Sequence, residues 1–351
     1  MPAERPRHRR KVLALLRAIK HAPGGDGPRL ALADWLAEHG ERPRAQFIRA
    51  QVDMARGPQH GARYDRLETR TQDLLWRHYV DWLGPLGGVT EKWQIQWEYE
   101  RGLLHLRNLR LDQLQSEEML ALAGTETWAW VDGLTLVGKA PRRPRHGRVV
   151  LASPLDSRMV IDPKGSALPL RTQGAAAVAV SPLLKGINYL RLHENQMIGP
   201  KGAAALAASP TVATLDQLSL DENGIGDAGA KALAASAYLT SLTQLFLGGN
   251  AIGPKGATAL ASSPHLNNLE VLFLHDNAIG DAGAQALAAS PHLVHLTRAD
   301  WSDNGIGDVG AQALASSPTM GKLTYLGLSG NPIGEACATA LKKRFGESVR
   351  F

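Results

Sequence analysis

Six asparagines recur at an almost constant interval in the second half of this chain, and no other feature of the sequence constrains its fold as much. They lie 28, 27, 27, 27 and 27 residues apart, at Asn195, Asn223, Asn250, Asn277, Asn304 and Asn331. Apolar residues stand eight, five and three positions before each one, as Leu242, Leu245 and Leu247 do before Asn250. A fixed period of roughly 20 to 50 residues is typical of stacked repeat units. We therefore expect an array of similar units that share one core.

Each unit is expected to begin with a short strand followed by a turn. The apolar residues five and three positions before the asparagine are two residues apart. They therefore point to one side of an extended segment, and the residue between them points to the other side. The asparagine suits the turn, because its short amide side chain can bond backbone groups that have no partner in the sheet.

A helix is expected to complete each unit. Residues 229–234, 256–261 and 283–288 repeat the pattern Gly-Ala-x-Ala-Leu-Ala, which places one apolar stripe on a helix. Prolines then prevent these helices from continuing, at Pro182, Pro210, Pro264, Pro291 and Pro318. The chain has 36 glycines and only 5% aromatic residues, which favours regularly placed turns over a helical bundle.

Strand, turn and helix in a unit of about 27 residues resemble the leucine-rich repeat. The pattern LxxLxLxxNxIG resembles in particular the ribonuclease-inhibitor type, a class that also includes the Ran GTPase-activating protein. This resemblance implies an α/β solenoid, a horseshoe with parallel strands on its concave face and helices on its convex face. Six clear copies cover residues 187–345, preceded by an expected strand over 130–136 and an expected helix over 174–182.

One copy of the repeat departs from the pattern. It carries Ala299 and Trp301 where the other copies have two leucines. A small residue beside a large one roughly conserves the volume of a core. We therefore expect Trp301 to be packed in the core rather than to bind a ligand.

The first hundred residues are expected to form a small, mainly helical domain. The expected elements are an amphipathic helix around residues 12–19, helices over 28–38, 44–54 and 63–83, and two strands over 93–99 and 102–107. Glycines at 84, 87 and 88 are expected to end the long helix.

Residues 26–51 resemble the repeat-companion domain that precedes leucine-rich repeats in some bacteria. The resemblance rests on Arg29, Ala33-Asp34-Trp35-Leu36, Gly40 and Phe47-Ile48-Arg49. It implies a bacterial protein but no activity. A physical role follows from the repeats themselves, because an open solenoid exposes its core and its sheet edge at both ends and needs caps. At the other end, the charged helix that contains Lys342, Lys343 and Arg344 is expected to close the array.

We expect four parts along the chain. They are a helical companion domain (1–88), an N-terminal cap with a degenerate first repeat (89–137), an irregular basic insertion (138–173), and the repeats with a C-terminal cap (174–351). The insertion is too long for one turn and contains Pro141-Arg-Arg-Pro-Arg-His-Gly-Arg148.

The composition fits an ordered protein of the cytoplasm. The 351 residues are 44% hydrophobic and 21% charged, and Cys337 is the single cysteine. One cysteine excludes an intramolecular disulfide and a cysteine-based zinc site, and it fits a reducing compartment. The apolar run 12–16 is cut by Arg17 and is too short for a signal peptide, and no run is long enough for a membrane span. The formal charge is +6 in all, with +7 in residues 1–150 and −1 in 151–351.

The sequence predicts no catalytic, cofactor or metal site. It contains no GxxxxGK[ST], HExxH or GxSxG motif. Cys337 takes the place of a repeat-helix glycine and is expected to pack against the core. Two histidines, His292 and His295, are too few for a metal site. Asp34 is expected to pair with Arg29 or a backbone amide, and Trp35 to belong to the core.

The outward positions of the strands predict a protein-binding concave face. Its predicted residues are Tyr189, Arg191, His193, Glu194, Asp221, Glu222, Phe246, Phe273, His275, Asp276, Arg298, Asp300, Asp303 and Tyr325. Phe246 and Phe273 hold the same position in consecutive repeats, so their rings are expected to be neighbours, about 4.8 Å apart. Grouped exposed aromatic residues anchor interfaces, and acids outnumber bases around them. Alternatively, the two rings only shield each other and the acids keep the face solvated.

These observations favour a non-enzymatic scaffold, adaptor or inhibitor whose partner is a protein with a basic or aromatic-bearing surface. A GTPase-activating protein is an alternative that the repeat resemblance alone implies, because fold does not determine function. A nucleic-acid-associated protein is a further alternative, suggested by two basic runs: Arg5, Arg7, Arg9, Arg10 and Lys11, and Arg142, Arg143, Arg145 and Arg148. No recognition motif accompanies these runs, and such runs are usually solvated.

Overall fold

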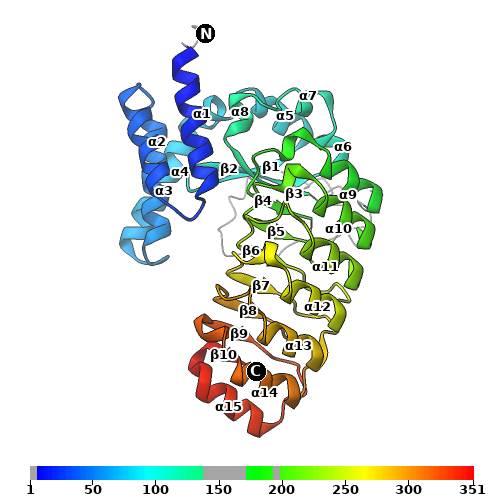
Figure 1. Ribbon diagram of the computed structural model, residues 1–351. Coiled ribbons are helices and arrows are strands. Elements are labelled where there is room, and N and C mark those ends of the chain that lie inside the picture. The colour runs from blue at the N-terminus through cyan, green and yellow to red at the C-terminus, as the bar shows by residue number, and fades with distance from the viewer. Residues whose placement is uncertain (1–5, 137–170, 193–197) are drawn as a thin grey trace, which may run out of the picture.

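A single curved sheet with strands in sequence order organises the molecule (Figure 1). The computed structural model describes residues 6–136, 171–192 and 198–351. In this part of the chain the sheet has ten strands, of which β1 (Gln96–Glu100) is antiparallel to β2 (Leu103–Leu109). Every later pair is parallel, from β2 and β3 (Val131–Leu136) onward.

The repeats place their strands on one side of the molecule and their helices on the other (Figure 1). The strands are β4 (Tyr189–Arg191), β5 (Gln217–Ser219), β6 (Gln244–Phe246), β7 (Val271–Phe273), β8 (Arg298–Asp300) and β9 (Tyr325–Gly327). The helices are α9 (Arg171–Ala179), α10 (Gly199–Ala207), α11 (Gly226–Ala234), α12 (Pro254–Ala261), α13 (Gly280–Ala288), α14 (Asp308–Ser316) and α15 (Glu335–Phe345). This arrangement confirms the predicted α/β solenoid. A short strand, β10 (Val349–Arg350), follows α15, the last α-helix, and pairs with β9. That α15 closes the array stays a prediction.

The leucines of the repeat form one continuous core. Leu218, Leu245 and Leu272 are at most 1% exposed, and they pair with one another across β5, β6 and β7. Burying a leucine side chain completely stabilises a fold by roughly 1.5–3 kcal/mol. The departing repeat follows the same rule, because Ala299 and Trp301 are both fully buried, which confirms that Trp301 is a packing residue.

The repeat asparagines bond the backbone of neighbouring units, as the sequence predicts. Asn250 is fully buried, and its Oδ1 accepts hydrogen bonds from the backbone N–H of Asn223 (3.0 Å) and Ile225 (3.3 Å). Its Nδ2 donates to the carbonyls of Leu220 (2.9 Å) and Gly248 (3.0 Å). Equivalent side-chain bonds are made by Asn223, Asn277, Asn304 and Asn331, whereas Asn195 lies outside the described residues.

A second ladder of side chains was not predicted. The hydroxyl of the serine at each helix end donates to a carbonyl of the preceding repeat at 2.5 Å, and five serines do so: Ser209, Ser236, Ser263, Ser290 and Ser317. Five short 3₁₀ turns follow such positions or lead into the next strand: Pro182–Leu184, Pro210–Val212, Pro264–Leu266, Met320–Lys322 and Gly346–Ser348. Each of these serines ties neighbouring repeats together, and a proline directly after it ends the helix in every case except Ser236, which precedes Ala237.

The N-terminal part is helical, with one helix more than expected. Its long helices are α1 (Pro6–His21), α2 (Gly27–Glu38), α3 (Arg42–Arg56), α4 (Ala62–Leu83) and α5 (Pro85–Trp93). Three single-turn helices lie between β2 and β3: α6 (Leu111–Leu114), α7 (Glu117–Leu120) and α8 (Glu126–Ala129). Trp93 belongs to α5 rather than to the first strand, so that part of the strand prediction is wrong. Because α5 spans residue 88, the exact boundary between the first two predicted parts stays a prediction.

The helical part shares its core with the repeats. Phe47 of α3 is 2% exposed and belongs to the same core cluster as the strand leucines. Arg44 is also buried, and its guanidinium carbon lies 3.4 Å from the centre of the Trp130 ring. A cation stacked on an indole in this way is stabilised by the ring quadrupole, and it links α3 to the start of β3.

Of two sequence expectations for single residues, the pairing of Asp34 needs correction and the packing of Cys337 is confirmed. Asp34 pairs with Arg49 at 2.5 Å rather than with Arg29, because Arg29 is turned toward the backbone of the α1–α2 loop. Cys337 is partly buried and packs against the repeat core, as expected, and its thiol donates to the carbonyl of Asp308 at 3.7 Å. Burial and the neighbouring Asp308 raise the pKa of the Cys337 thiol.

Most of the predicted basic insertion lies outside the described residues. Residues 138–170 are not described, and residues 171–173 belong to α9 rather than to an irregular segment. None of the described helices is both long enough and apolar enough to cross a bilayer.

Candidate protein-binding face

The outward positions of β4–β9 form the floor of the concave face. Leu245 is buried between Gln244 and Phe246, which are both half-buried, so alternate residues of a strand face the core and the concave side. The predicted residues His193 and Glu194 lie outside the described residues. The other predicted positions lie along or directly after these strands.

The two phenylalanines of this face are in contact. Phe246 pairs with Phe273 across β6 and β7. Their ring centres are 5.2 Å apart and the planes are inclined by 86°, an edge-to-face arrangement. Aromatic pairs favour this geometry because the positive ring edge meets the negative ring face. The predicted neighbourhood of the two rings is therefore confirmed.

Two further side chains extend this pair into an aromatic cluster, which we define as Phe246, Phe273, Arg298 and Tyr325. The Tyr325 ring lies 6.4 Å from the Phe273 ring. The guanidinium of Arg298 lies 5.9 Å from the centre of Phe273 and 5.7 Å from the centre of Tyr325. The arginine therefore joins rings that come from different repeats.

Carboxylates lie beside the aromatic cluster, directly before the repeat asparagines. We call Asp221, Glu222, Asp276 and Asp303 the acidic edge. Glu222, Asp276 and Asp303 are exposed and take left-handed backbone conformations, with φ of 57°, 54° and 52°. Asp221 is held more firmly, because its carboxylate accepts hydrogen bonds from Ser219 and from the backbone of Gly248, both at 2.7 Å.

Asp300 and His275 are part of the face but serve different local roles. Asp300 accepts a hydrogen bond from Ser302 at 2.7 Å and a weaker one from the Tyr325 hydroxyl at 3.5 Å. The His275 ring lies against Gly248, where a Cβ atom would come within 2.3 Å of the ring. Glycine at 248 therefore leaves room for the imidazole.

At the N-terminal end of the face, two side chains that the sequence did not indicate, His105 and Asp132, lie near the predicted Tyr189. Tyr189 stacks on His105 with ring centres 5.6 Å apart, and Arg191 lies 5.8 Å from the Tyr189 ring. Burial alone would lower the pKa of His105, but Asp132 at 3.7 Å and Glu100 at 3.7 Å raise it above its ordinary value. His105 and Asp132 belong to strands that lack the repeat pattern, so no periodic signal pointed to them.

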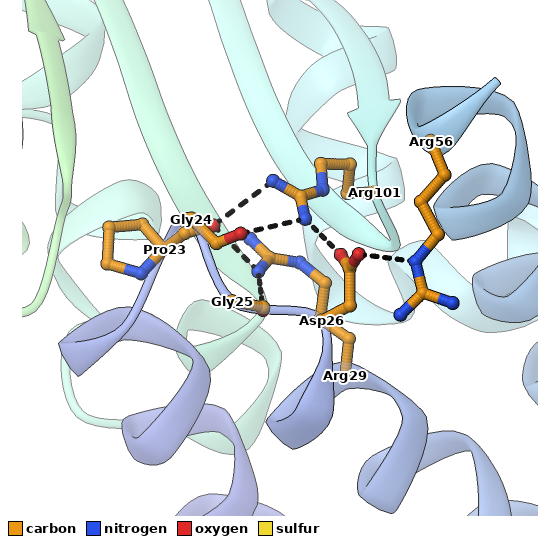
Figure 2. A network of polar contacts seen from close by, with 7 residues as sticks. All are labelled: Pro23, Gly24, Gly25, Asp26, Arg29, Arg56 and Arg101. Atoms are coloured by element: carbon orange, nitrogen blue, oxygen red, sulfur yellow. Dashed lines mark hydrogen bonds and ion pairs between the residues drawn. The ribbon is translucent and has the colours of Figure 1, made fainter.

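A network of arginines fixes the α1–α2 loop beside this end of the face (Figure 2). Arg29 donates to the carbonyls of Pro23 and Gly25, both at 2.8 Å. Arg101 donates to Asp26, which also accepts from Arg56 at 2.7 Å. Burial alone would raise the pKa of Asp26, but the two guanidinium groups hold it below its ordinary value.

Two open cavities lie beneath this loop. One, of about 400 Å³, is lined by His21, Pro23, Asp216, Thr240, Ser241, Thr243, Asn268, Glu270 and His295. The other, of about 250 Å³, is lined by residues of the loop, of β1–β3 and of the first repeats, including His105, Asp132, Asn188, Tyr189, Gln217 and Gln244. Pro23 and Asp216 line both cavities. Within the described ranges, no three His, Cys, Asp or Glu side chains are grouped so that they could hold a metal ion.

Sequence comparison identifies the repeats that carry this face. The Leucine Rich repeat family matches residues 213–234, 238–261, 265–288 and 290–315. These stretches are leucine-rich repeats. Three of the leucine-rich repeats contribute Phe246, Phe273 and Arg298 to the aromatic cluster. No curated protein is significantly similar to the chain in sequence.

Two solved structures are distantly similar to this chain. An internalin from Listeria monocytogenes strain 4b F2365 is similar with a TM-score of 0.36 and 19% identity, covering 70% of this chain and 58% of the internalin. A structure of the Rad7 and Elc1 complex in yeast is similar with a TM-score of 0.32 and 14% identity, covering 67% of this chain and 64% of the matched chain. The chain thus spans less than two thirds of each of these solved chains.

Proposed function

We propose that this protein binds a protein partner through the concave face of its leucine-rich repeats. The aromatic cluster is the anchor, and the acidic edge selects a segment that carries basic or aromatic side chains. No catalytic step is part of this proposal.

The contact between Phe246 and Phe273 is the observation that carries the proposal. The core of these repeats is already filled by leucines such as Leu245 and Leu272, which are fully buried on the opposite side of the strands. The two rings are left half-exposed at the centre of the face. Clustered aromatic residues with an adjacent arginine are the residue types that supply most of the binding energy in protein interfaces.

The charge around the cluster supports the choice of partner. The acidic edge carries four carboxylates, and Arg298 and Arg191 are the two arginines at the predicted positions. Complementary charge speeds the encounter of two proteins and excludes wrong partners more than it strengthens binding. A basic segment is therefore attracted to the face, while contact with the rings holds it.

The test is affinity capture from a lysate of the source cell, with bound proteins identified by mass spectrometry. The double variant Phe246→Ala and Phe273→Ala is expected to lose the partner that the wild type captures, because each anchor residue contributes roughly 2 kcal/mol or more. Tyr238→Ala is the matched control, since Tyr238 is 39% exposed but lies outside the strands. With circular dichroism unchanged, retained capture by the double variant contradicts the proposal.

We further infer that residues 1–88 act as a companion domain that caps the N-terminal end of the array. The contacts of Phe47 with the repeat core and of Arg44 with Trp130 support this role. The remaining division of the chain at 137 and 173, the ribonuclease-inhibitor type of the repeats, a bacterial source and a cytoplasmic location stay predictions.

A further inference from the structure

A column of polar side chains runs along the edge of the sheet where the repeat strands begin. We define the polar column as Asp132, Asn188, Asp216, Thr243 and Glu270, each directly before the first outward residue of its strand or, in Asp132, at the equivalent place in β3. Backbone hydrogen bonds join the members, from Asn188 N–H to the Asp132 carbonyl (2.9 Å) and from Asp216 N–H to the Asn188 carbonyl (2.8 Å). The column therefore places three carboxylates on alternate strands, in β3 and directly before β5 and β7.

Two of these carboxylates have no cationic partner among the described residues. Asp216 accepts a hydrogen bond from the Thr243 hydroxyl at 2.7 Å, and no lysine or arginine of the described ranges forms an ion pair with Asp216 or Glu270. Burial raises the pKa of Asp216, and although Thr243 opposes this shift, the charges of Asp132 and Glu270 add to it. Among the described residues, no ion pair compensates the negative charge of Asp216 and Glu270.

The cations nearest to the column are engaged elsewhere. Lys20 donates to the carbonyl of Val131 at 2.6 Å and its charge acts on Asp132. Arg29 holds the loop carbonyls, and Arg101 binds Asp26 (Figure 2). The cavity of about 400 Å³ has Asp216 and Glu270 in its wall together with His21 and His295, and no lysine or arginine.

An independent observation also indicates a missing hydrogen-bond donor. Asn188 is only 3% exposed, and its Oδ1 accepts no hydrogen bond in the described structure, whereas its Nδ2 donates to the Lys20 carbonyl at 2.7 Å. The Oδ1 of Asp132, which is 8% exposed, is likewise without a donor. Both residues line the cavity of about 250 Å³ together with Asp216; Arg29, Arg101 and Arg107 line it as well, and Arg107 pairs with Glu98. Buried acceptors without a donor are costly, so they mark a place where a donor group is favoured.

We propose that a lysine or arginine side chain of the protein partner enters the space between the α1–α2 loop and the polar column and pairs with Asp216 and Glu270. This inference rests on the proposed function of the concave face. Gln217 and Gln244 line the neighbouring cavity and also face the concave side. Gln244 is two residues before Phe246, a distance of about 7 Å along a strand. A segment bound to the aromatic cluster therefore reaches the column with one long cationic side chain.

The first test uses a small cation as the probe. Agmatine carries a guanidinium and an ammonium on a short chain, and its binding to the full-length protein is followed by the NMR shifts of the Thr243 and Glu270 amides. Agmatine is expected to bind saturably to the wild type and at least tenfold more weakly to Asp216→Asn with Glu270→Gln. The control, Asp65→Asn with Glu91→Gln, removes two exposed charges from α4 and α5 and is expected to bind as the wild type does. Equal affinity for the column variant, or equal binding of the dianion glutarate, overturns the inference.

The second test separates this inference from the proposed function. The partner identified by capture is titrated against the column variant and against Phe246→Ala with Phe273→Ala. The inference is supported if the column variant (Asp216→Asn with Glu270→Gln) binds the partner at least tenfold more weakly than the wild type. The phenylalanine variant (Phe246→Ala with Phe273→Ala) must still bind agmatine as the wild type does. If the phenylalanine variant loses the partner while the column variant keeps it, the proposed function stands and the side-chain assignment fails. If the column variant loses agmatine but keeps the partner, the place binds free cations and the assignment also fails.

Discussion

The residue before each of the five repeat asparagines that the structure describes has a left-handed backbone. This position is occupied by Glu222, Gly249, Asp276, Asp303 and Gly330, all with φ between 52° and 71°. Only glycine takes this conformation freely, and aspartate tolerates it better than most residues. Three residues of the acidic edge, Glu222, Asp276 and Asp303, therefore occupy positions that few residue types other than glycine adopt easily. Their exposed carboxylates recur at the same place in their respective repeats, beside the aromatic cluster.

A first prediction concerns Ala251, which follows the asparagine and has a φ of 55°. Glycine occupies the equivalent positions 224 and 305, also with positive φ. An alanine in the left-handed region costs about 1 kcal/mol, so Ala251→Gly is expected to stabilise the protein by roughly that amount in urea unfolding. Ala278 is the matched control, because it is exposed and lies outside the left-handed region. Ala278→Gly is expected to destabilise by about 0.5 kcal/mol, and a loss of stability in both variants would refute the argument.

For single residues, the sequence predicted the contacts that follow from the repeat period. It missed the contacts that long side chains make with residues of other strands or helices. The repeat placed Phe246 and Phe273 at one register position, so their contact followed from spacing alone. The link from Phe273 through Arg298 to Tyr325 depends on how far a long side chain extends over two strands. The sequence also predicted the wrong arginine, Arg29 instead of Arg49, as the partner of Asp34. The packing of the helices decides which guanidinium lies near this carboxylate, and the sequence pattern does not show that packing.

At the level of the elements, an aspartate of one repeat helix accepts hydrogen bonds from backbone N–H groups at the start of the next repeat helix. Asp227 of α11 accepts hydrogen bonds from the backbone N–H of Gly253 (2.7 Å) and Gly256 (2.8 Å), at the start of α12. Asp281 does the same for Gly307 and Gly310, both at 2.8 Å. Each aspartate thus satisfies donors that a helix N-terminus leaves without partners.

The second prediction tests this cap between repeats. Asp227→Ala removes two charge-assisted hydrogen bonds from α12, so the free energy of unfolding is expected to fall by about 2 kcal/mol. Asp308 gives a graded comparison, because it accepts one such bond, from Gly334 N–H at 2.7 Å in an exposed position. Asp308→Ala is expected to cost about half as much. Equal losses measured by urea unfolding would show that the number of bonds does not set the cost.

Elements with a strong period were predictable, and elements without one were not. Strands β4–β9 and helices α10–α14 follow from six copies of one pattern, whose leucines and alanines fix both the type and the face of each element. The helix α5 was missed because Gly84, Gly87 and Gly88 are typical of a break, whereas Pro85 at its start is well placed to begin a helix. The two-residue strand β10 has no pattern of its own and exists because β9 offers it an edge.

On the scale of the whole molecule, the helical part and the repeats meet at one polar junction. The C-terminal end of α1 lies over the start of the sheet, where Lys20 donates to Val131 and Asn188 donates to the Lys20 carbonyl. The aliphatic side of α1 is buried through Val12, Leu16 and Ile19. The junction therefore holds the loop that covers the polar column, and a change of charge at Lys20 affects both parts.

The last prediction is a pH dependence of stability that belongs to this junction. Burial lowers the pKa of Lys20 to about 8, even though the charge of Asp132 opposes the shift. Above this pH the folded protein has released the proton that the unfolded chain still binds up to about pH 10.4, so Lys20 makes stability rise with pH across this window. The difference in unfolding free energy between wild type and Lys20→Met is expected to shift by about 2 kcal/mol in favour of the wild type from pH 7 to pH 10. Urea unfolding at intervals of half a pH unit measures it. Parallel curves for the two proteins would mean that the ammonium is not desolvated at the junction, because all other titrating groups are common to both and cancel in the difference.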